Sequence, residues 1–332
     1  MGSHTVFSQM VNVMKASCLR VFVAALFASI TTPAFAQIDL SGNWASRQHE
    51  DWQDRGPGPE VVDYLGLPIN DEARARSLSY STSALSLPER QCLYYPPHYV
   101  VIGPQPIKIW SETDPVTGRV VAWKISAAVD RAILTIWMDG RPHPSDDAVH
   151  PFAGFTTGVW EGDTLTTYTT HVKAGYIRRN GVPSSDQVTV SEHISRHGET
   201  LTITAIIEDP IYLTEPHIIS RSWQLDPTAN LSPVAAPCVP EAEVPGLKGD
   251  GFVPHYLPGK NPFVDDVTKM YNIPVEAVLG GADTMYPEYR KKLKDKYVAP
   301  TMCVRYCCGW GGFGGGGNAA PGLKCTTGGS AQ

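Results

Sequence analysis

Between residues 98 and 225, short runs rich in Val, Ile, Thr and Trp alternate with clusters of turn-forming residues. Within the run 187–195, apolar and polar positions alternate, with Val188, Val190 and Ile194 opposite Thr189, Ser191 and His193. The run 200–208 shows the same period of two residues. This period is typical of β-strands that turn one face to a core and the other to polar surroundings.

The strand pattern recurs along the chain, at 98–103, 106–112, 119–127, 130–138, 155–161, 164–171, 187–195, 200–208 and 216–225. Hairpin turns are predicted at 114–118, 161–163 and 196–199, where Gly, Asp or Pro interrupts the pattern. Short connections cannot hold the crossover that parallel strands need, so we predict an antiparallel meander. This many short strands indicates a closed barrel or a two-sheet sandwich.

One more strand is predicted well before this region, at the opening of the expected mature protein, over Leu40-Ser41-Gly42-Asn43-Trp44. Its Gly-x-Trp resembles the first strand of lipocalin-like barrels. In such barrels an Arg from the last strand often stacks on the Trp, and the resemblance assigns that part to Arg221. The alternative is an ordinary core Trp.

The composition changes several times along the chain, which predicts its organisation. We expect a signal peptide at 1–36 and a β-domain at 37–226 with an irregular, partly helical N-terminal part. A Pro/Gly-rich linker follows at 227–262, then short helices at 263–300 and a Cys/Gly-rich tail at 301–332. The expected fold class is therefore mainly β, an antiparallel lipocalin-like barrel or sandwich with a helical, Cys/Gly-rich C-terminal extension.

Helices are predicted from capping residues and periodicity. Asn70 can cap a short helix whose first turn contains Asp71 and Glu72, two residues that suit its positive end. Further short helices are expected near 263–272, 274–280 and 284–297.

The N-terminus has the pattern of a secretory signal. Lys15 and Arg20 precede an apolar run at 21–30, and Ala34-Phe35-Ala36 forms a cleavage site. The run is shorter than the roughly 20 residues that span a bilayer. We therefore expect a periplasmic or extracellular protein without a transmembrane segment after cleavage; an uncleaved anchor is the alternative.

Cysteine usage agrees with an oxidising compartment. Six cysteines remain after cleavage, an even number that suggests disulfides: Cys92, Cys238, Cys303, Cys307, Cys308 and Cys325. Cys92 and Cys238 flank the strand-rich core, so we predict that they pair. The other four lie in the tail, where they could staple it or link it covalently to another chain in a homotypic association.

The formal net charge of −6 and the lack of a basic stripe argue against nucleic acid as a partner. The chain also lacks a Gly-x-Ser-x-Gly elbow, a P-loop and a dinucleotide-binding fingerprint. These absences leave binding of a small molecule and other enzyme classes open.

Three motifs occur in order: Asp139-Gly140-Arg141-Pro142-His143-Pro144, Gly158-Val159-Trp160-Glu161-Gly162-Asp163-Thr164-Leu165, and Asp209-Pro210 with Tyr212. Together they resemble a group of uncharacterised secreted bacterial proteins that share Asp-Gly-Arg-x-His-Pro, Gly-x-Trp-Glu-Gly-Asp-Thr-Leu and Asp-Pro-x-x-Tyr. The resemblance covers roughly 85–225 and implies compartment and fold. Members often carry His-Ser before the second motif, where this chain has Phe155-Thr156-Thr157.

Four histidines are the candidate catalytic residues, together with one arginine: His143, His150, His171, His193 and Arg141. Imidazole beside a carboxylate can perform acid–base catalysis or bind zinc or iron, and His143, His150 and His171 are the speculative metal ligands. Asp146 and Glu192 are the nearby carboxylates. The alternative is that each His faces solvent or bonds to loop backbone. For Arg141, either a ligand carboxylate or simple turn chemistry is open.

Aromatic residues on the strands suggest a ligand site inside the barrel, lined by Trp123, Trp137, Tyr168 and Trp223. The leading hypothesis is thus an exported β-barrel protein that binds a small apolar or aromatic molecule. The alternatives are a secreted lyase, isomerase or metal-dependent hydrolase that uses the His/carboxylate cluster, or a surface interaction protein crosslinked through its tail.

Overall fold

The computed structural model describes residues 38–47, 62–64, 66–81, 87–103, 105–127, 132–178, 180–232, 238–242, 256–257 and 259–293. The chain divides into two units, Met1–Ile38 and Asp39–Gln332, and the structure below belongs to the second. The predicted signal peptide and the Cys/Gly-rich tail lie outside the described residues.

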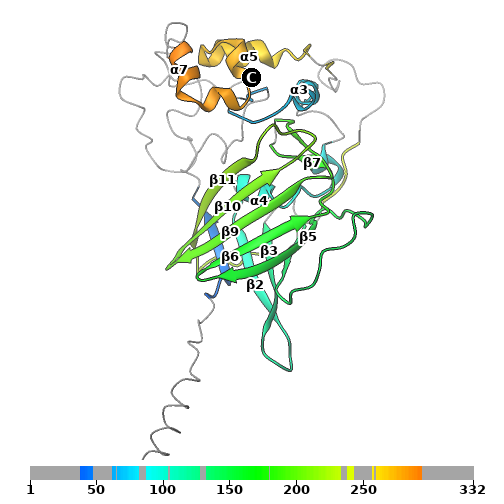
Figure 1. The fold of residues 1–332 in the computed structure, drawn as a ribbon, viewed down its shortest axis with the longest axis vertical. Coiled ribbons are helices and arrows are strands. Elements are labelled where there is room, and N and C mark those ends of the chain that lie inside the picture. Colours follow the sequence, from blue (N-terminus) through cyan, green and yellow to red (C-terminus); the bar gives the residue numbers. More distant parts are fainter. Residues whose placement is uncertain are drawn as a thin grey trace, which may run out of the picture. The chain divides into compact units, whose positions relative to one another are not determined.

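A closed β-barrel forms the main body of this unit (Figure 1). Its strands follow one another around the barrel in the order β1, β11, β10, β9, β6, β5, β4, β3, β2. They are β1 Gly42–Ser46, β2 Ile107–Thr113, β3 Val120–Ala127, β4 Leu134–Trp137, β5 Phe155–Glu161, β6 Thr164–Thr170, β9 Thr189–His197, β10 Thr200–Glu208 and β11 His217–Leu225. The prediction of a mainly β protein is confirmed, and of its two architectures the barrel is correct.

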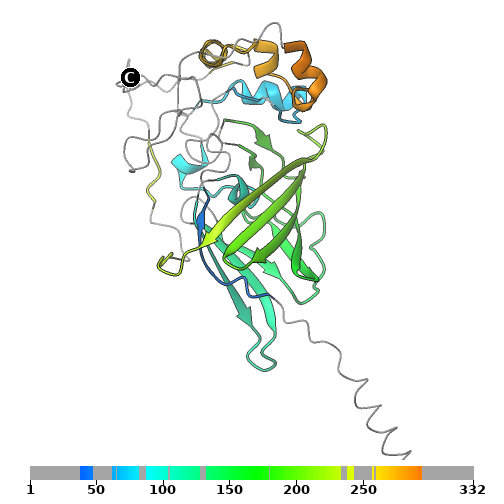
Figure 2. The same cartoon turned by 90° about the vertical axis from the view of Figure 1, so that its left-hand side faces the viewer.

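The predicted antiparallel meander is wrong at one place, because β4 and β5 pair in parallel. The connection over 138–154 is long enough to return the chain to the same end of the barrel before β5 begins. A small ribbon, β7 Gly175–Tyr176 with β8 Pro183–Ser184, lies in the chain between β6 and β9. The other neighbouring strand pairs around the barrel are antiparallel. Figure 2 shows the barrel strands after a turn of 90° about the vertical axis.

The predicted strand at 98–103 is also wrong, because Tyr99–Ile102 forms the short helix α4. Pro96 and Pro97 precede it, and the Tyr99 amide donates to the Pro96 carbonyl at 3.0 Å. The Tyr95 and Tyr99 rings stack with their centroids 4.3 Å apart. Packing against β10 and β11 therefore outweighs the strand preference of the Val-rich sequence.

Strand register decides which side chains fill the barrel, since directly opposed residues share a face. Large apolar side chains from every part of the barrel are buried there, among them Trp44, Ile109, Ile125, Ile136, Leu165, Ile194, Ile203 and Trp223. The cation over the Trp44 ring is Arg196, at 5.2 Å from its centroid. Arg196 belongs to β9, whereas the lipocalin-like resemblance assigns this part to Arg221 of the last strand, β11.

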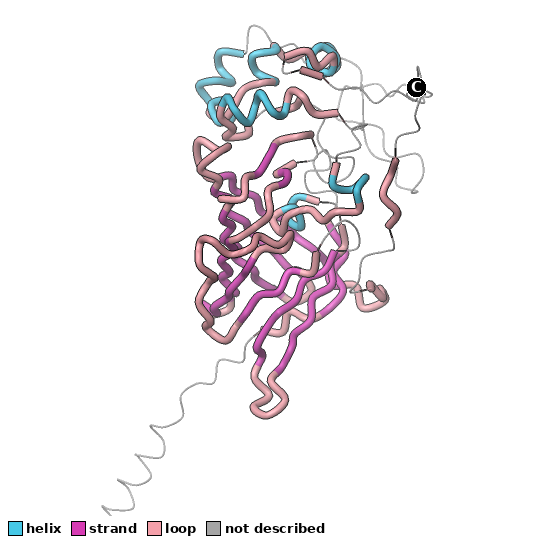
Figure 3. The backbone as a smooth tube through the Cα atoms, turned by 90° about the vertical axis from the view of Figure 1, so that its right-hand side faces the viewer, coloured by secondary structure: helices cyan, strands magenta, loops and turns pink. Residues whose placement is uncertain are grey.

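The predicted helix after Asn70 is confirmed as α3, Asp71–Ser77, and the Asn70 Oδ1 accepts from the Ala73 amide at 3.0 Å. The predicted C-terminal helices are found as α5 Phe263–Tyr271, α6 Val275–Val278, η3 Ala282–Met285 and α7 Pro287–Leu293; a further 3₁₀ turn is η1, Pro88–Gln91. Figure 3 distinguishes these helices from the strands by colour. None of the described helices is long and apolar enough to cross a membrane.

Hydrogen bonds join the C-terminal helices to the segment before α3. The Tyr64 amide donates to the Val278 carbonyl at 3.0 Å, and the Arg74 Nε donates to the Leu279 carbonyl at 2.7 Å. The described part of the predicted linker is also anchored, since Lys108 Nζ on β2 donates to the Leu231 carbonyl at 2.9 Å.

The predicted disulfide between Cys92 and Cys238 is confirmed, with its Cα atoms 5.7 Å apart. It attaches the residue after η1 to the segment 238–242. The Glu241 amide also donates to the Arg90 carbonyl at 2.7 Å, and the two side chains form a salt bridge. Cys303, Cys307, Cys308 and Cys325 lie outside the described residues.

Candidate functional site

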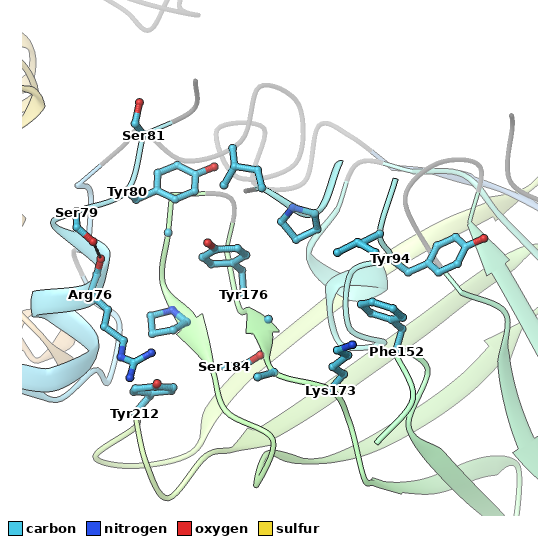
Figure 4. Close-up of a pocket in the computed structure, with 17 residues that line it drawn as sticks. Arg76, Ser79, Tyr80, Ser81, Tyr94, Phe152, Lys173, Tyr176, Ser184 and Tyr212 are labelled. Carbon is cyan, nitrogen blue, oxygen red and sulfur yellow. Dashed lines mark hydrogen bonds between the residues drawn. The ribbon is translucent and has the colours of Figure 1, made fainter. Parts of the chain in front are cut away.

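Two hollows on the described part of the chain are candidate sites. The larger of these two has a volume of about 520 Å³ and an aromatic wall (Figure 4). Five rings line it: Tyr80, Tyr94, Phe152, Tyr176 and Tyr212. We call this hollow the aromatic cleft. Its residues come from the end of α3, the segment after η1, the loop before β5, the β7–β8 ribbon and the connection to β11.

Close packing holds these rings in place. Tyr80 and Tyr176 meet edge to face with centroids 5.8 Å apart, and Tyr94 and Phe152 do so at 6.0 Å. Gly181 has a φ of +91°, and a Cβ added there would lie 2.3 Å from the Tyr80 side chain. Glycine at this position therefore permits both the backbone turn and the approach of the ring.

Two cations lie at the aromatic cleft. The Arg76 guanidinium is 5.3 Å from the centroid of Tyr212, and the Lys173 ammonium is 4.7 Å from that of Phe152. Arg76 also pairs with Glu72 at 3.5 Å in an exposed salt bridge, an interaction that solvent weakens. Among the described residues that line the cleft there is no Asp or Glu.

A second hollow, of about 350 Å³, lies on the outer face of the barrel over β5, β6 and β9. We call it the outer hollow. Arg141, Thr157, Thr166, Tyr168 and Ser191 supply its polar and aromatic lining.

Arg141 is held at the edge of the outer hollow by a neighbour in its own turn. Its Nε donates to both carboxylate oxygens of Asp139, at 2.9 and 3.1 Å, and its Nη2 donates at 2.5 Å. This hydrogen bonding lowers the pKa of Asp139 below its usual range. The guanidinium also lies 3.6 Å from the centroid of Trp137. Turn chemistry thus accounts for Arg141, and its Nη1 takes no part in the bonds to Asp139.

Two predicted histidines form a continuous chain of hydrogen bonds below the outer hollow. His143 Nε2 lies 2.9 Å from Thr157 Oγ1, and His143 Nδ1 lies 2.7 Å from Thr170 Oγ1. Thr170 Oγ1 is also 2.7 Å from His171 Nδ1. His171 Nε2 lies 2.9 Å from the Ser145 carbonyl oxygen, where the chain ends.

His150 joins this group by ring contact, with its centroid 5.0 Å from that of His171. Its Nδ1 lies 3.3 Å from the Val172 carbonyl oxygen. The structure thus brings together the three histidines predicted as metal ligands. Among the described residues, however, no group of three His, Cys, Asp or Glu side chains is arranged to hold a metal ion. Asp146, the predicted partner, forms no salt bridge with them in the described structure.

His193 stands apart from these three. Its Nδ1 lies 3.2 Å from Thr166 Oγ1, which donates to the exposed carboxylate of Glu161 at 2.7 Å. Because the Thr166 hydroxyl proton is donated to that carboxylate, the Thr166 oxygen accepts a hydrogen bond from His193 Nδ1. In this pair the imidazole donates to the hydroxyl. A general base would instead accept the hydroxyl proton, so His193 is not oriented to act as one.

The four predicted ligand-binding aromatics are divided between the two sides of the barrel wall. Trp123 and Trp223 are buried inside, and Trp223 Nε1 donates to the Gln105 carbonyl at 3.2 Å. Trp137 and Tyr168 lie on the outside, where Tyr168 is 44% exposed. These residues do not line one common hollow.

Glu192 lies inside the barrel, although the polar residues on either side of it in the sequence face outward. It is 3% exposed, and Thr167 Oγ1 approaches its carboxylate at 3.4 Å. Burial raises the pKa of Glu192 to about 7. The sequence held a signal for this placement, since Glu192 shares the period of Val190 and Ile194.

A basic group is buried elsewhere in the interior, at the His217 end of β11. Burial lowers the pKa of His217 to about 3, and the positive charge of Arg178 contributes, followed by His98 and Arg221. His217 is therefore neutral at physiological pH.

Apart from Tyr212 of the third motif, the residues of the aromatic cleft were missed by sequence reasoning, because most of them lie on irregular segments without hydrophobic periodicity. The only available signal was the abundance of Tyr and Pro around 94–97. Comparison with known proteins adds no further residue, since no family model, curated protein or solved structure matches the chain.

Proposed function

We propose that the protein is an exported β-barrel that binds a small apolar or aromatic molecule, and that the aromatic cleft holds this ligand. The observation that carries the proposal is a hollow of about 520 Å³ with five aromatic rings in its wall. Pockets of this size that are lined by aromatic side chains suit small organic molecules. The barrel acts as the scaffold on which the cleft is built.

The cleft is a better site than the barrel interior, which is filled by side chains. Trp44 and Trp223 are fully buried there. At the inward-facing Gly158, an added Cβ would lie only 2.7 Å from Ile136 Cγ2. So close a contact leaves no room for a ligand at that level of the barrel.

The charges at the cleft favour a ligand with an acidic group. Lys173 and Arg76 contribute positive charge, and none of the described residues that line the cleft is an Asp or Glu. A carboxylate or sulfonate on the ligand would gain a charge-assisted contact, with Lys173 the better partner because Arg76 already pairs with Glu72.

Two fluorescent probes of nearly the same shape test the proposal: neutral N-phenyl-1-naphthylamine and anionic 1-anilinonaphthalene-8-sulfonate. We expect saturable binding of both to the folded protein. Tyr176→Ala should weaken both by roughly tenfold, because it removes a central ring of the wall. Lys173→Gln should weaken only the sulfonate.

Tyr286→Ala is the matched control, because Tyr286 is exposed and does not line the cleft. Near-ultraviolet circular dichroism confirms that each variant is folded. Binding that Tyr176→Ala leaves unchanged, or that Tyr286→Ala weakens equally, would rule out the aromatic cleft as the site.

A further inference from the structure

We propose that Thr157 is a nucleophile activated by His143, and that the outer hollow hydrolyses small carboxylic esters. This activity is separate from ligand binding in the aromatic cleft, since no residue lines both hollows. It depends on the chain of hydrogen bonds that runs from Thr157 to the Ser145 carbonyl, in which the donor and acceptor roles are determined at the Ser145 end.

The direction follows from the Ser145 carbonyl, which can only accept a hydrogen bond. His171 Nε2, 2.9 Å away, therefore carries its proton, and in a neutral ring Nδ1 is then an acceptor. Thr170 donates its hydroxyl proton to this Nδ1 at 2.7 Å, so that its oxygen accepts from His143 Nδ1. The remaining nitrogen, His143 Nε2, must accept from Thr157 at 2.9 Å.

The Thr157 hydroxyl therefore donates to a neutral His143 imidazole, whose Nδ1 is held by the Thr170 hydroxyl. This arrangement of nucleophile, base and orienting group is the one that activates hydroxyls for attack on acyl carbons. The His143 ring packs 5.0 Å from Phe155 and 5.4 Å from Tyr168, measured between centroids. Its partial burial, with the nearby His171, lowers the pKa of His143 and favours the basic form.

Thr157 lines the outer hollow, which places this residue beside a substrate bound there. In the acylation step, Thr157 Oγ1 bonds to the ester carbonyl carbon and its proton passes to His143 Nε2. The bond between the carbonyl carbon and the alcohol oxygen then breaks, and the alcohol leaves with that proton. Water, deprotonated by His143, next attacks the acyl-threonine, releases the carboxylic acid and returns the proton to Thr157.

Arg141 lines the outer hollow, and its Nη1, which takes no part in the bonds to Asp139, is the donor that favours the oxyanion formed during both steps. Thr166 lines the same hollow but gives its proton to Glu161. A carboxylate is a weaker base than imidazole, with a usual pKa near 4.3 against about 6.5. Thr157 is therefore the better nucleophile of the two hydroxyls.

The test uses p-nitrophenyl acetate with the full chain. We expect release of p-nitrophenol, and an acetyl group on the peptide that contains Thr157 after an acid quench. Thr157→Val should abolish both, whereas Thr157→Ser, which keeps the hydroxyl, should retain them. His143→Gln should slow acylation by about 10²- to 10⁴-fold.

Thr204→Val is the control, because Thr204 is an outward-facing strand threonine bonded to Ser220 and lies outside the outer hollow. The rate should rise with pH through a pKa below the usual value for histidine and then level off. An acetyl group found only on Lys or Tyr side chains, or full activity in Thr157→Val, would overturn the proposal. So would the absence of hydrolysis by the wild-type chain.

Discussion

At the scale of single residues, Glu192 shows how register can place an acid where composition would not. Its neighbours Ser191 and His193 face outward, and the alternation of β9 then turns Glu192 into the barrel. No Lys, Arg or His of the described residues forms a salt bridge with it. A buried carboxyl without a cationic partner is more stable protonated.

Glu192 should make stability fall with rising pH. Its pKa rises from an ordinary 4.5 to about 7 on folding, so between these values the native state binds more protons than the unfolded chain. The stabilising contribution is complete below pH 4.5 and lost as pH rises through 7. The free energy of unfolding of Glu192→Gln, relative to that of wild type, should therefore rise by about 3 kcal/mol between pH 4.5 and pH 8. Urea unfolding at the two pH values measures this change.

Glu208→Gln is the matched control for this experiment, because Glu208 ends β10 and is exposed. Its difference from wild type should be the same at both pH values. If the Glu192→Gln difference were also constant, Glu192 would be ionised in the native barrel, with water beside it.

The clustered histidines also owe their arrangement to tertiary contacts. His143, His150 and His171 were predicted from residue type alone, and folding brings all three together. Thr170, which joins two of the imidazoles, has no distinguishing feature in the sequence. Thr157 is marked only as part of Phe155-Thr156-Thr157, which occupies the place where the resembling group often carries His-Ser. Their roles follow from side chains that meet only after the loop 138–154 packs beside β5 and β6.

At the scale of elements, β5 combines the one parallel pairing of the barrel with a tightly packed glycine. A Cβ at Gly158 would lie 2.7 Å from Ile136 Cγ2 and 3.1 Å from Leu165 Cδ1. Glycine at this position therefore allows β4 and β6 to pack their side chains across β5.

Gly158→Ala should destabilise the protein by about 1–3 kcal/mol through overpacking, read as a lower urea midpoint. Val159→Thr is the control on the next, exposed position, and should change stability by less than about 0.5 kcal/mol. Equal effects of the two substitutions would contradict the prediction, because the side chains beside Gly158 would then be able to move and make room for the added methyl group.

At the scale of the whole molecule, the Cys92–Cys238 disulfide spans 146 residues and so encloses most of the barrel strands in one covalent loop. It also holds the segment after η1, which supplies Tyr94 to the aromatic cleft. A crosslink of this kind stabilises chiefly by restricting the unfolded chain.

Replacement of both cysteines by serine should lower the free energy of unfolding by about 2–4 kcal/mol. Denaturant unfolding of the double variant and of oxidised wild type measures this. Reduced wild type should match the double variant; a reduced protein as stable as the oxidised one would contradict the prediction.

The sequence by itself determined the β-architecture, because alternation with a period of two is a local property that each strand carries. It also indicated the hairpins, the Asn70-capped helix and the Cys92–Cys238 pair. Each of these depends on residues close in sequence or on the simple elimination of other partners.

Only the tertiary structure decided the parallel β4–β5 pairing, the helix at Tyr99–Ile102 and the partner of Trp44. It likewise decided that Glu192 faces inward and that Thr157 donates to His143. These features depend on contacts between segments far apart in the chain. Their free energies come from burial and hydrogen-bond geometry that no local pattern encodes.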